Sequence, residues 1–264
     1  PRSRRPPPEK MARYGVVSRS GKGAMGVVYS AYDDVMERSV AIKVMMADIQ
    51  DDPETSTRFH REAHAAGQLI HRNIVTIFDL GEDDGRPFIV MELIEGQSLG
   101  DYLKRPEGVQ LEDKIGLMLQ VCDGLRVAHA KAIFHRDIKP GNLFVTSSGD
   151  LKVLDFGIAR LASCSMTMSG LIMGTPDYMS PEQACGREVD QRSDIFSAGG
   201  VFYFMLTGRK PFAAPDLPAV LMKVQNEDPL PIRETEAPPS LASLEVIVDS
   251  AIVRSASSFS IAPP

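Results

Sequence analysis

Cysteine is scarce in this chain of 264 residues, which contains only 3. Cys122, Cys164 and Cys185 are odd in number and widely separated, and none has the spacing of a metal-binding pair. These observations argue against a disulfide framework and against a cysteine-ligated metal site. They predict free thiols in a reducing compartment.

An excess of positive charge and long apolar runs are also missing. The 29 basic and 35 acidic residues give a net charge of -6 at pH 7, and no basic stripe marks a nucleic-acid surface. The apolar or small run from Ile195 to Leu206 is about twelve residues long, whereas a membrane-spanning helix needs about twenty. We therefore expect no nucleic-acid partner and no membrane segment, and we predict that this run forms a buried helix.

The first residues, 1–11, combine prolines with basic side chains and have no apolar stretch. This composition does not match a signal peptide. We expect these residues to be disordered.

Two polar motifs stand at the ends of a predicted β-hairpin. The sequence HRDIKPGN ends at Asn142, and DFG begins at Asp155. Between them, apolar runs at 143–145 and 151–154 flank turn formers at 147–150. Because a hairpin returns the chain antiparallel, the start of its first strand lies beside the end of its second. Asn142 and Asp155 are therefore predicted to converge on one point.

This point has the chemistry of a magnesium site. The amide oxygen of Asn142 and the carboxylate of Asp155 are hard ligands, and Mg²⁺ completes its coordination with water and substrate phosphates. Asp137 can face an incoming hydroxyl, and Lys139 can neutralise charge on a phosphate in transfer. The alternative is that Asp155 only caps a turn, but both motifs in this order and at this spacing favour phosphoryl transfer from a metal-bound nucleotide.

With these motifs the chain resembles the protein kinase family, in particular bacterial serine/threonine kinases of eukaryotic (Hanks) type, over about residues 12–250. The resemblance implies an α+β bilobal fold, with a small β-rich N-lobe carrying one regulatory helix and a larger, mainly helical C-lobe. It also implies ATP and Mg²⁺ as cofactors. The implied boundaries are an N-lobe at 12–91, a hinge at 92–96 and a C-lobe at 97–254, forming a kinase domain at 12–254, and then a short tail at 255–264 in place of the family's terminal helix.

A glycine-rich segment, GKGAMG, begins at Gly21. Glycines let backbone amides approach a phosphate with no Cβ in the way. The strand-forming residues that follow disfavour a dinucleotide-binding loop, which would need a helix there. In the resemblance the segment covers the ATP phosphates, and Val28 packs on the adenine. The covering residues are Gly21, Lys22, Gly23, Ala24, Met25 and Gly26.

Lys43 ends a predicted buried strand and therefore needs an opposite charge or a polar ligand. Glu62 lies on the apolar face of a helix predicted at about residues 55–70. From spacing alone, Glu62 could instead pair with Arg58, four residues earlier. The resemblance favours Lys43 with Glu62, because in kinases this ion pair holds the lysine against the α- and β-phosphates.

The resemblance also implies a pocket for the nucleotide base. Met91 guards the back of this pocket, and the main-chain groups of Glu92 and Ile94 bond the purine edge. Ala41 and Phe144 contact the base, with Phe144 as the floor. All five could otherwise be ordinary strand and core residues.

The segment from Gly174 to Glu182 resembles the one that closes a kinase activation loop. Thr175 together with Lys139 points to serine or threonine as the acceptor. We also expect autophosphorylation at Thr167 and Ser169, because Arg136 next to the catalytic aspartate can hold a phosphate on that loop.

Two further residues have structural roles in the resemblance. Asp194 hydrogen-bonds the backbone of the catalytic loop. His135 packs beneath Phe156, which makes it a core histidine rather than a proton carrier.

Three positions depart from the family pattern. Ser20 replaces an aliphatic residue that touches the nucleotide, and Ser180 replaces an alanine, a small change that we expect to be harmless. No arginine follows Arg254, so that Glu182 is expected to lack its family partner. A buried, unpaired carboxylate would destabilise the larger lobe by several kcal/mol.

Three functions remain open at this stage. The first is a serine/threonine protein kinase with protein substrates. The second is a nucleotide-binding pseudokinase or scaffold, inactivated by a shortened C-lobe. The third is a small-molecule phosphotransferase such as an antibiotic kinase, although those enzymes lack a segment like 174–182. Some relatives dimerise through the small lobe, and the resemblance admits such a homodimer here. We expect a cytoplasmic location, either for this chain alone or as the cytoplasmic domain of a longer membrane-anchored protein.

Overall fold

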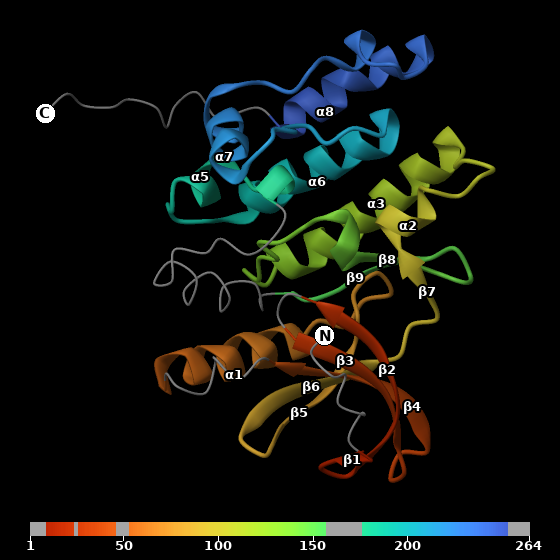
Figure 1. The fold of residues 1–264 in the computed structure, drawn as a ribbon, viewed down its shortest axis with the longest axis vertical. Coiled ribbons are helices and arrows are strands. Elements are labelled where there is room, and N and C mark those ends of the chain that lie inside the picture. Colours follow the sequence, from red (N-terminus) through yellow and green to blue (C-terminus); the bar gives the residue numbers. More distant parts are fainter. Residues whose placement is uncertain (1–8, 24–25, 46–52, 157–175, 253–264) are drawn as a thin grey trace, which may run out of the picture.

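The computed structural model describes residues 9–23, 26–45, 53–156 and 176–252. Figure 1 shows two lobes, one built around a curled sheet with a single long helix and the other built mainly of helices. Among the described residues, no helix is both long enough and apolar enough to cross a membrane. The predicted tail at 255–264 and residues 1–8 of the predicted disordered start lie outside this part of the chain.

The N-lobe is a six-stranded antiparallel sheet in the order β1-β2-β3-β4-β6-β5. Its helix, α1 (Pro53–Gly67), packs on the sheet through Phe59 and Ala63, which are completely buried. The helix ends earlier than predicted, and Ile70 beyond it is 83% exposed. The strands are β1 (Lys10–Met11), β2 (Tyr14–Gly23), β3 (Gly26–Asp33), β4 (Arg38–Met45), β5 (Ile77–Asp83) and β6 (Arg86–Glu92).

The prediction that residues 1–11 are disordered is wrong for the last two of them. Lys10 and Met11 form β1 and pair with β2, and Met11 is buried. The apolar side chain of Met11 belongs to the buried cluster of the sheet that includes Tyr14 and Phe88. Burial of this side chain stabilises the strand.

The C-lobe begins where β6 leads into a second, three-stranded sheet in the order β7-β8-β9. The strands are β7 (Gly96–Ser98), β8 (Leu143–Thr146) and β9 (Leu151–Val153). The helices are α2 (Leu99–Tyr102), α3 (Leu111–His129), α5 (Pro181–Ala184), α6 (Gln191–Thr207), α7 (Leu217–Asn226) and α8 (Glu245–Ile252). Short 3-10 helices are η2 (Pro140–Asn142), η3 (Pro176–Tyr178), η4 (Ile232–Glu234) and η5 (Pro239–Leu244).

Helix α6 forms the core of the C-lobe, as the apolar run from Ile195 predicts. It is buried along most of its length and packs against α3 and α8 (Figure 1). Asp190 caps its first turn by accepting the Arg192 backbone N–H, and the helix ends at Gly208, whose φ of 71° is left-handed. The helix thereby provides a rigid base for the catalytic loop.

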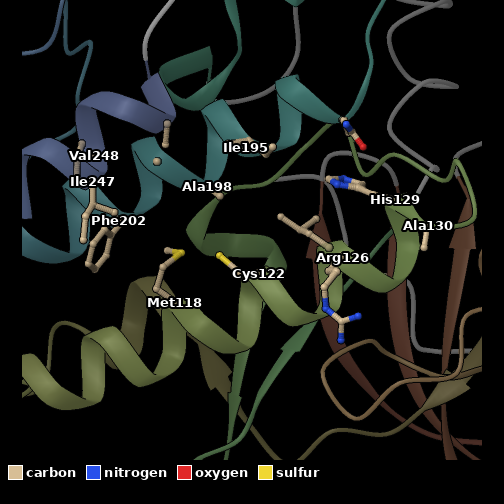
Figure 2. Close-up of a pocket in the computed structure, with 14 residues that line it drawn as sticks. Met118, Cys122, Arg126, His129, Ala130, Ile195, Ala198, Phe202, Ile247 and Val248 are labelled. Atoms are coloured by element: carbon tan, nitrogen blue, oxygen red, sulfur yellow. The ribbon is translucent and has the colours of Figure 1, made fainter.

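An apolar groove of about 670 Å³ lies between α3, α6 and α8. Figure 2 shows Arg126 and His129 at one end of this groove and Phe202, Ile247 and Val248 at the other. None of the predicted site residues lines it.

Gly26 is required by packing within the N-lobe sheet. A Cβ added at this position would lie 2.0 Å from the Val44 carbonyl oxygen of the neighbouring strand. At Gly21, in the same glycine-rich segment, an added Cβ would have no heavy atom within 4 Å. The two glycines therefore serve different purposes, and only Gly21 lies in open space where a ligand could approach.

We expect Gly26→Ala to lower the free energy of unfolding by about 1–3 kcal/mol, because the β3 and β4 backbones must move apart. Each kcal/mol corresponds to a fall in Tm of about 2–4 °C for a domain of this size. Gly21→Ala is the matched control and should leave Tm almost unchanged. Equal Tm values for the two variants in thermal unfolding would contradict the steric explanation.

Candidate active site

The predicted hairpin is confirmed: it consists of β8 and β9, with Asn142 just before its first strand and Asp155 just after its second. Leu143 pairs with Val153, and the Leu154 backbone N–H donates to the Asn142 carbonyl oxygen at 2.9 Å. Asn142 ends η2 directly before β8, and Asp155 follows β9 with a left-handed φ of 62°.

Asp137 is the centre of a hydrogen-bonded cluster in the catalytic loop. Its Oδ2 accepts from Lys139 Nζ at 2.7 Å and from Asn142 Nδ2 at 2.8 Å. Asn142 Nδ2 also donates to the Asp137 carbonyl oxygen at 2.8 Å. The amide nitrogen of Asn142 is thus engaged by Asp137, which fixes the orientation of its amide and leaves the oxygen Oδ1 as the atom suited to a metal ion.

Lys43 forms its ion pair with Asp155, at 2.7 Å between Nζ and Oδ2. The Lys43 side chain is 8% exposed and that of Asp155 is 21% exposed. Burial on its own raises the pKa of Asp155, but the charge and hydrogen bond of Lys43, helped by Lys139, lower this pKa below its ordinary value. The carboxylate is therefore ionised at neutral pH. The stability that the pair contributes is lost only as the pH falls through the lowered pKa.

The predicted Lys43–Glu62 ion pair is replaced in the structure by two other pairs. Lys43 contacts Asp155, and Glu62 Oε1 lies 3.8 Å from Arg136 Nη1. The short contact with Asp155 takes the Lys43 ammonium, and the orientation of α1 directs Glu62 toward the catalytic loop. The alternative partner, Arg58, has a side chain outside the described part of the structure.

A divalent metal ion fits the chemistry of this site. Asn142 Oδ1 and the ionised Asp155 carboxylate would offer such an ion oxygen ligands at one edge of the hairpin. The described residues contain no group of three or more His, Cys, Asp or Glu side chains that could hold a metal by themselves. A metal here would therefore take its remaining ligands from phosphate oxygens and water, as Mg²⁺ does in nucleotide sites.

The glycine-rich segment connects β2 and β3 as a hairpin, with Gly23 paired to Gly26. Ala24 and Met25 at its tip lie outside the described residues, as does the side chain of Lys22.

Four residues predicted for the base pocket share one apolar cluster: Val28, Ala41, Met91 and Ile94. The cluster also contains Val75, Leu93 and Leu154, which sequence reasoning missed. Leu154 could have been found, because it directly precedes Asp155, whereas Val75 carries no local signal. Phe144, the predicted floor, lies on β8 opposite Lys152 and outside this cluster.

Glu92 connects the hinge to the strand that leads to Asp155. Its Oε1 accepts from Lys152 Nζ at 2.6 Å and from the Thr76 backbone N–H at 2.7 Å. The Glu92 backbone N–H donates to the Thr76 carbonyl oxygen at 3.0 Å. The backbone N–H of Glu92 is therefore already engaged and is not available to a purine. The contact with Lys152 was missed because the two residues lie far apart in the sequence.

Asp194 anchors the catalytic loop from α6, as expected. Its carboxylate accepts the backbone N–H of His135 at 2.8 Å and that of Arg136 at 2.7 Å. His129 Nε2 lies 2.8 Å from the same carboxylate. The side chain of Asp194 is completely buried, so that these donors replace water entirely.

His135 is a core histidine, as predicted. It is completely buried, and its ring centroid lies 4.8 Å from that of Phe156. Its Nδ1 accepts the Asp137 backbone N–H, and its Nε2 donates to the Leu154 carbonyl oxygen. A neutral ring protonated at Nε2 satisfies both contacts and leaves neither nitrogen for proton transfer.

The prediction that Glu182 is a buried, unpaired carboxylate is wrong. Its carboxylate accepts a hydrogen bond from Ser193 Oγ in the first turn of α6. The Glu182 side chain is half-buried rather than buried, so that water also reaches it. Among the described residues, a hydroxyl group thus pairs with this carboxylate. Thr167, Ser169 and Thr175 lie outside the described residues.

Comparison with known proteins agrees with this geometry. The model of the protein kinase domain family matches residues 14–247. The chain is 42% identical over 242 residues to the probable serine/threonine-protein kinase PknB of Bifidobacterium longum, covering 87% of this chain and 34% of that protein. It is 40% identical over 247 residues to the serine/threonine-protein kinase Pkn1 of Myxococcus xanthus, covering 91% and 35% respectively. The chain thus spans about a third of the length of these two relatives.

The crystal structure of the Mycobacterium tuberculosis PknI kinase domain matches with a TM-score of 0.74 and 26% identity, covering 92% of this chain and 89% of that one. This match confirms the predicted α+β bilobal fold. Together, the catalytic loop, the hairpin and these similarities show that the chain belongs to the protein kinase family, among the bacterial serine/threonine kinases of eukaryotic type.

Proposed function

We propose that this domain is an active protein kinase that transfers the γ-phosphate of Mg²⁺-bound ATP to serine and threonine hydroxyls of proteins. The observation that carries the proposal is the convergence of Asp137, Lys139 and Asn142 with the Lys43–Asp155 pair at one end of a hairpin.

Each residue has a distinct role in this reaction. Asp137 orients the acceptor hydroxyl and accepts its proton, and the described contacts to its carboxylate engage only Oδ2. Lys139 stabilises negative charge on the transferring phosphate, and Lys43 stabilises the negative charge of the α- and β-phosphates. Asn142 and Asp155 hold the metal, which when bound neutralises charge on the phosphoryl group.

Activation is proposed to follow autophosphorylation at Thr167 and Ser169. Arg136 lies 3.8 Å from Glu62, a loose contact that a phosphate could replace with shorter, charge-assisted bonds. Glu62 would then pair with Lys43 in place of Arg136, and Asp155 would bind the metal in place of Lys43. This exchange links loop phosphorylation to both catalytic ion contacts.

Partners and location are proposals of the same kind. Protein substrates are expected, and a cytoplasmic location suits a kinase domain supplied with ATP. A homodimer through the N-lobe is supported by an exposed apolar turn between β3 and β4, where Val35 is 71% and Met36 is 59% exposed.

The test is incubation of the purified chain with labelled ATP, Mg²⁺ and a generic protein substrate. Label should appear on serine and threonine, disappear with a metal chelator and disappear in an Asp137→Asn control. Retained nucleotide binding without transfer would support the scaffold alternative. Label on an aminoglycoside but not on protein would support a small-molecule phosphotransferase.

The phosphosites need a separate measurement. We expect Thr167→Ala with Ser169→Ala to lower activity about tenfold or more, since ordering of the loop by phosphate is lost. Unchanged activity of this double variant would reject the activation proposal while leaving the kinase proposal intact.

A further inference from the structure

Ser180, the serine that replaces the family's usual alanine, is completely buried at the start of α5. Its Oγ accepts the Gln183 backbone N–H at 3.4 Å, and Gln183 Oε1 accepts the Ser180 backbone N–H at 3.1 Å. These reciprocal bonds form a capping box. Alanine at position 180 would keep the backbone N–H that holds the Gln183 side chain but would lose the Oγ that accepts the Gln183 backbone N–H. The serine side chain therefore acts on Gln183 through the backbone of the first turn of α5.

The other end of the Gln183 amide reaches the catalytic loop. Its Nε2 donates to the Arg136 carbonyl oxygen at 2.7 Å. Arg136 directly precedes Asp137 and has a left-handed φ of 66°, a conformation that costs free energy in a residue other than glycine. The Arg136 backbone N–H is held by Asp194 of α6. Both main-chain groups of this strained residue are therefore fixed, one from α6 and the other from α5.

The space beside this contact is too small for a substrate side chain. The cavity lined by Asp137, Tyr178, Met179 and Gln183 measures about 30 Å³, enough for roughly one water molecule. Ser197 Oγ donates to the Tyr178 carbonyl oxygen at 2.7 Å, which holds the same segment against α6. Among the described residues, Gln183 thus connects the catalytic loop with α5.

We propose that Gln183, oriented by Ser180, is a positioning residue that fixes the orientation of the peptide group between Arg136 and Asp137. In this way it couples the segment at 176–180 to the catalytic loop. The inference rests on the proposed kinase function. Because Gln183 contacts neither the nucleotide pocket nor the metal ligands, its effect should fall on the transfer step and not on ATP binding.

The test compares Gln183→Met and Ser180→Ala with wild type at a temperature where all are folded. We expect Gln183→Met to lower kcat for protein phosphorylation by about ten- to a hundredfold, since small misplacements of a catalytic group have effects of this size. The KM for ATP should stay within twofold. Gln110→Met is the matched control, because Gln110 caps α3 without any side-chain hydrogen bond to it.

The double variant separates this role from a general structural one. If Ser180 acts through Gln183, Ser180→Ala should lower kcat in wild type but have almost no further effect in Gln183→Met. Additive effects, or a kcat for Gln183→Met within twofold of wild type, would overturn the proposal.

Hydrogen exchange gives a readout independent of activity. The backbone amides of residues 135–138 should exchange faster in Gln183→Met than in wild type and Gln110→Met. Unchanged exchange would reject the role of Gln183 even if the wild-type chain transferred no phosphate. An inactive wild type with the expected exchange would reject only the proposed function.

Discussion

Replacing Asp155 by asparagine is expected to lower kcat/KM for phosphoryl transfer by about a thousandfold or more. The variant loses the carboxylate that we propose as a metal ligand. Charge stabilisation by a bound metal contributes several kcal/mol to the transition state, and each 1.4 kcal/mol changes the rate about tenfold. Asparagine tolerates the left-handed φ of 62° found at this position. The substitution therefore tests the charge with little backbone strain.

The measurement is steady-state kinetics over a range of Mg²⁺ concentrations, with Mg²⁺-dependent nucleotide binding followed by calorimetry. Asp150→Asn is the matched control, because Asp150 lies in the turn of the same hairpin and its side chain is 51% exposed. It should retain nearly full activity. An Asp155→Asn variant within tenfold of wild type would refute the assignment of Asp155 as a metal ligand.

Asp194→Asn is expected to reduce the free energy of unfolding by about 3–5 kcal/mol, since a buried charge with several donors is replaced by a group with one acceptor atom. The carboxylate receives two backbone N–H groups and contacts His129, and the amide would turn an N–H toward one of them. Domains of this kind are stable by only about 5–15 kcal/mol, so that the loss is a large fraction of the total.

Denaturant unfolding measures this loss, and activity below the unfolding transition shows whether the catalytic loop also moves. Asp190→Asn serves as the control at the start of the same helix, because Asp190 is 46% exposed and asparagine also caps helices well. Asp190→Asn should lower the free energy of unfolding by less than about 1 kcal/mol. Equal destabilisation by the two variants would mean that Asp194 has no special role as an anchor.

The sequence was most informative where function depends on residues close together in the chain. The approach of Asn142 and Asp155 follows from a hairpin whose turn and strands are visible in local composition, and the structure has that hairpin. The buried helix at 191–207 follows in the same way from a continuous apolar run. In both cases one element of secondary structure fixes the geometry.

Ion-pair partners were harder to predict, because they depend on how separate elements pack. Lys43 and Glu62 are both charged and both face the interior, but the orientation of α1 decides whether they meet. The partner of Glu182 was missed for another reason. Ser193 is neutral, and a search for opposite charge does not detect a hydroxyl donor. Tertiary packing and hydrogen bonding therefore limit what charge patterns alone can predict.

The arrangement of Lys43, Asp155, Arg136 and Glu62 has a thermodynamic consequence. Lys43 contacts Asp155 and Arg136 contacts Glu62, and an exchange of partners that joined Lys43 to Glu62 would make Arg136 available to a phosphate and Asp155 available to a metal. A change of about 1.4 kcal/mol in the free-energy difference between these two pairings shifts the ratio of their populations tenfold. A molecule that binds one of these two arrangements a hundredfold more tightly would therefore control which arrangement predominates, without competing for the metal ligands.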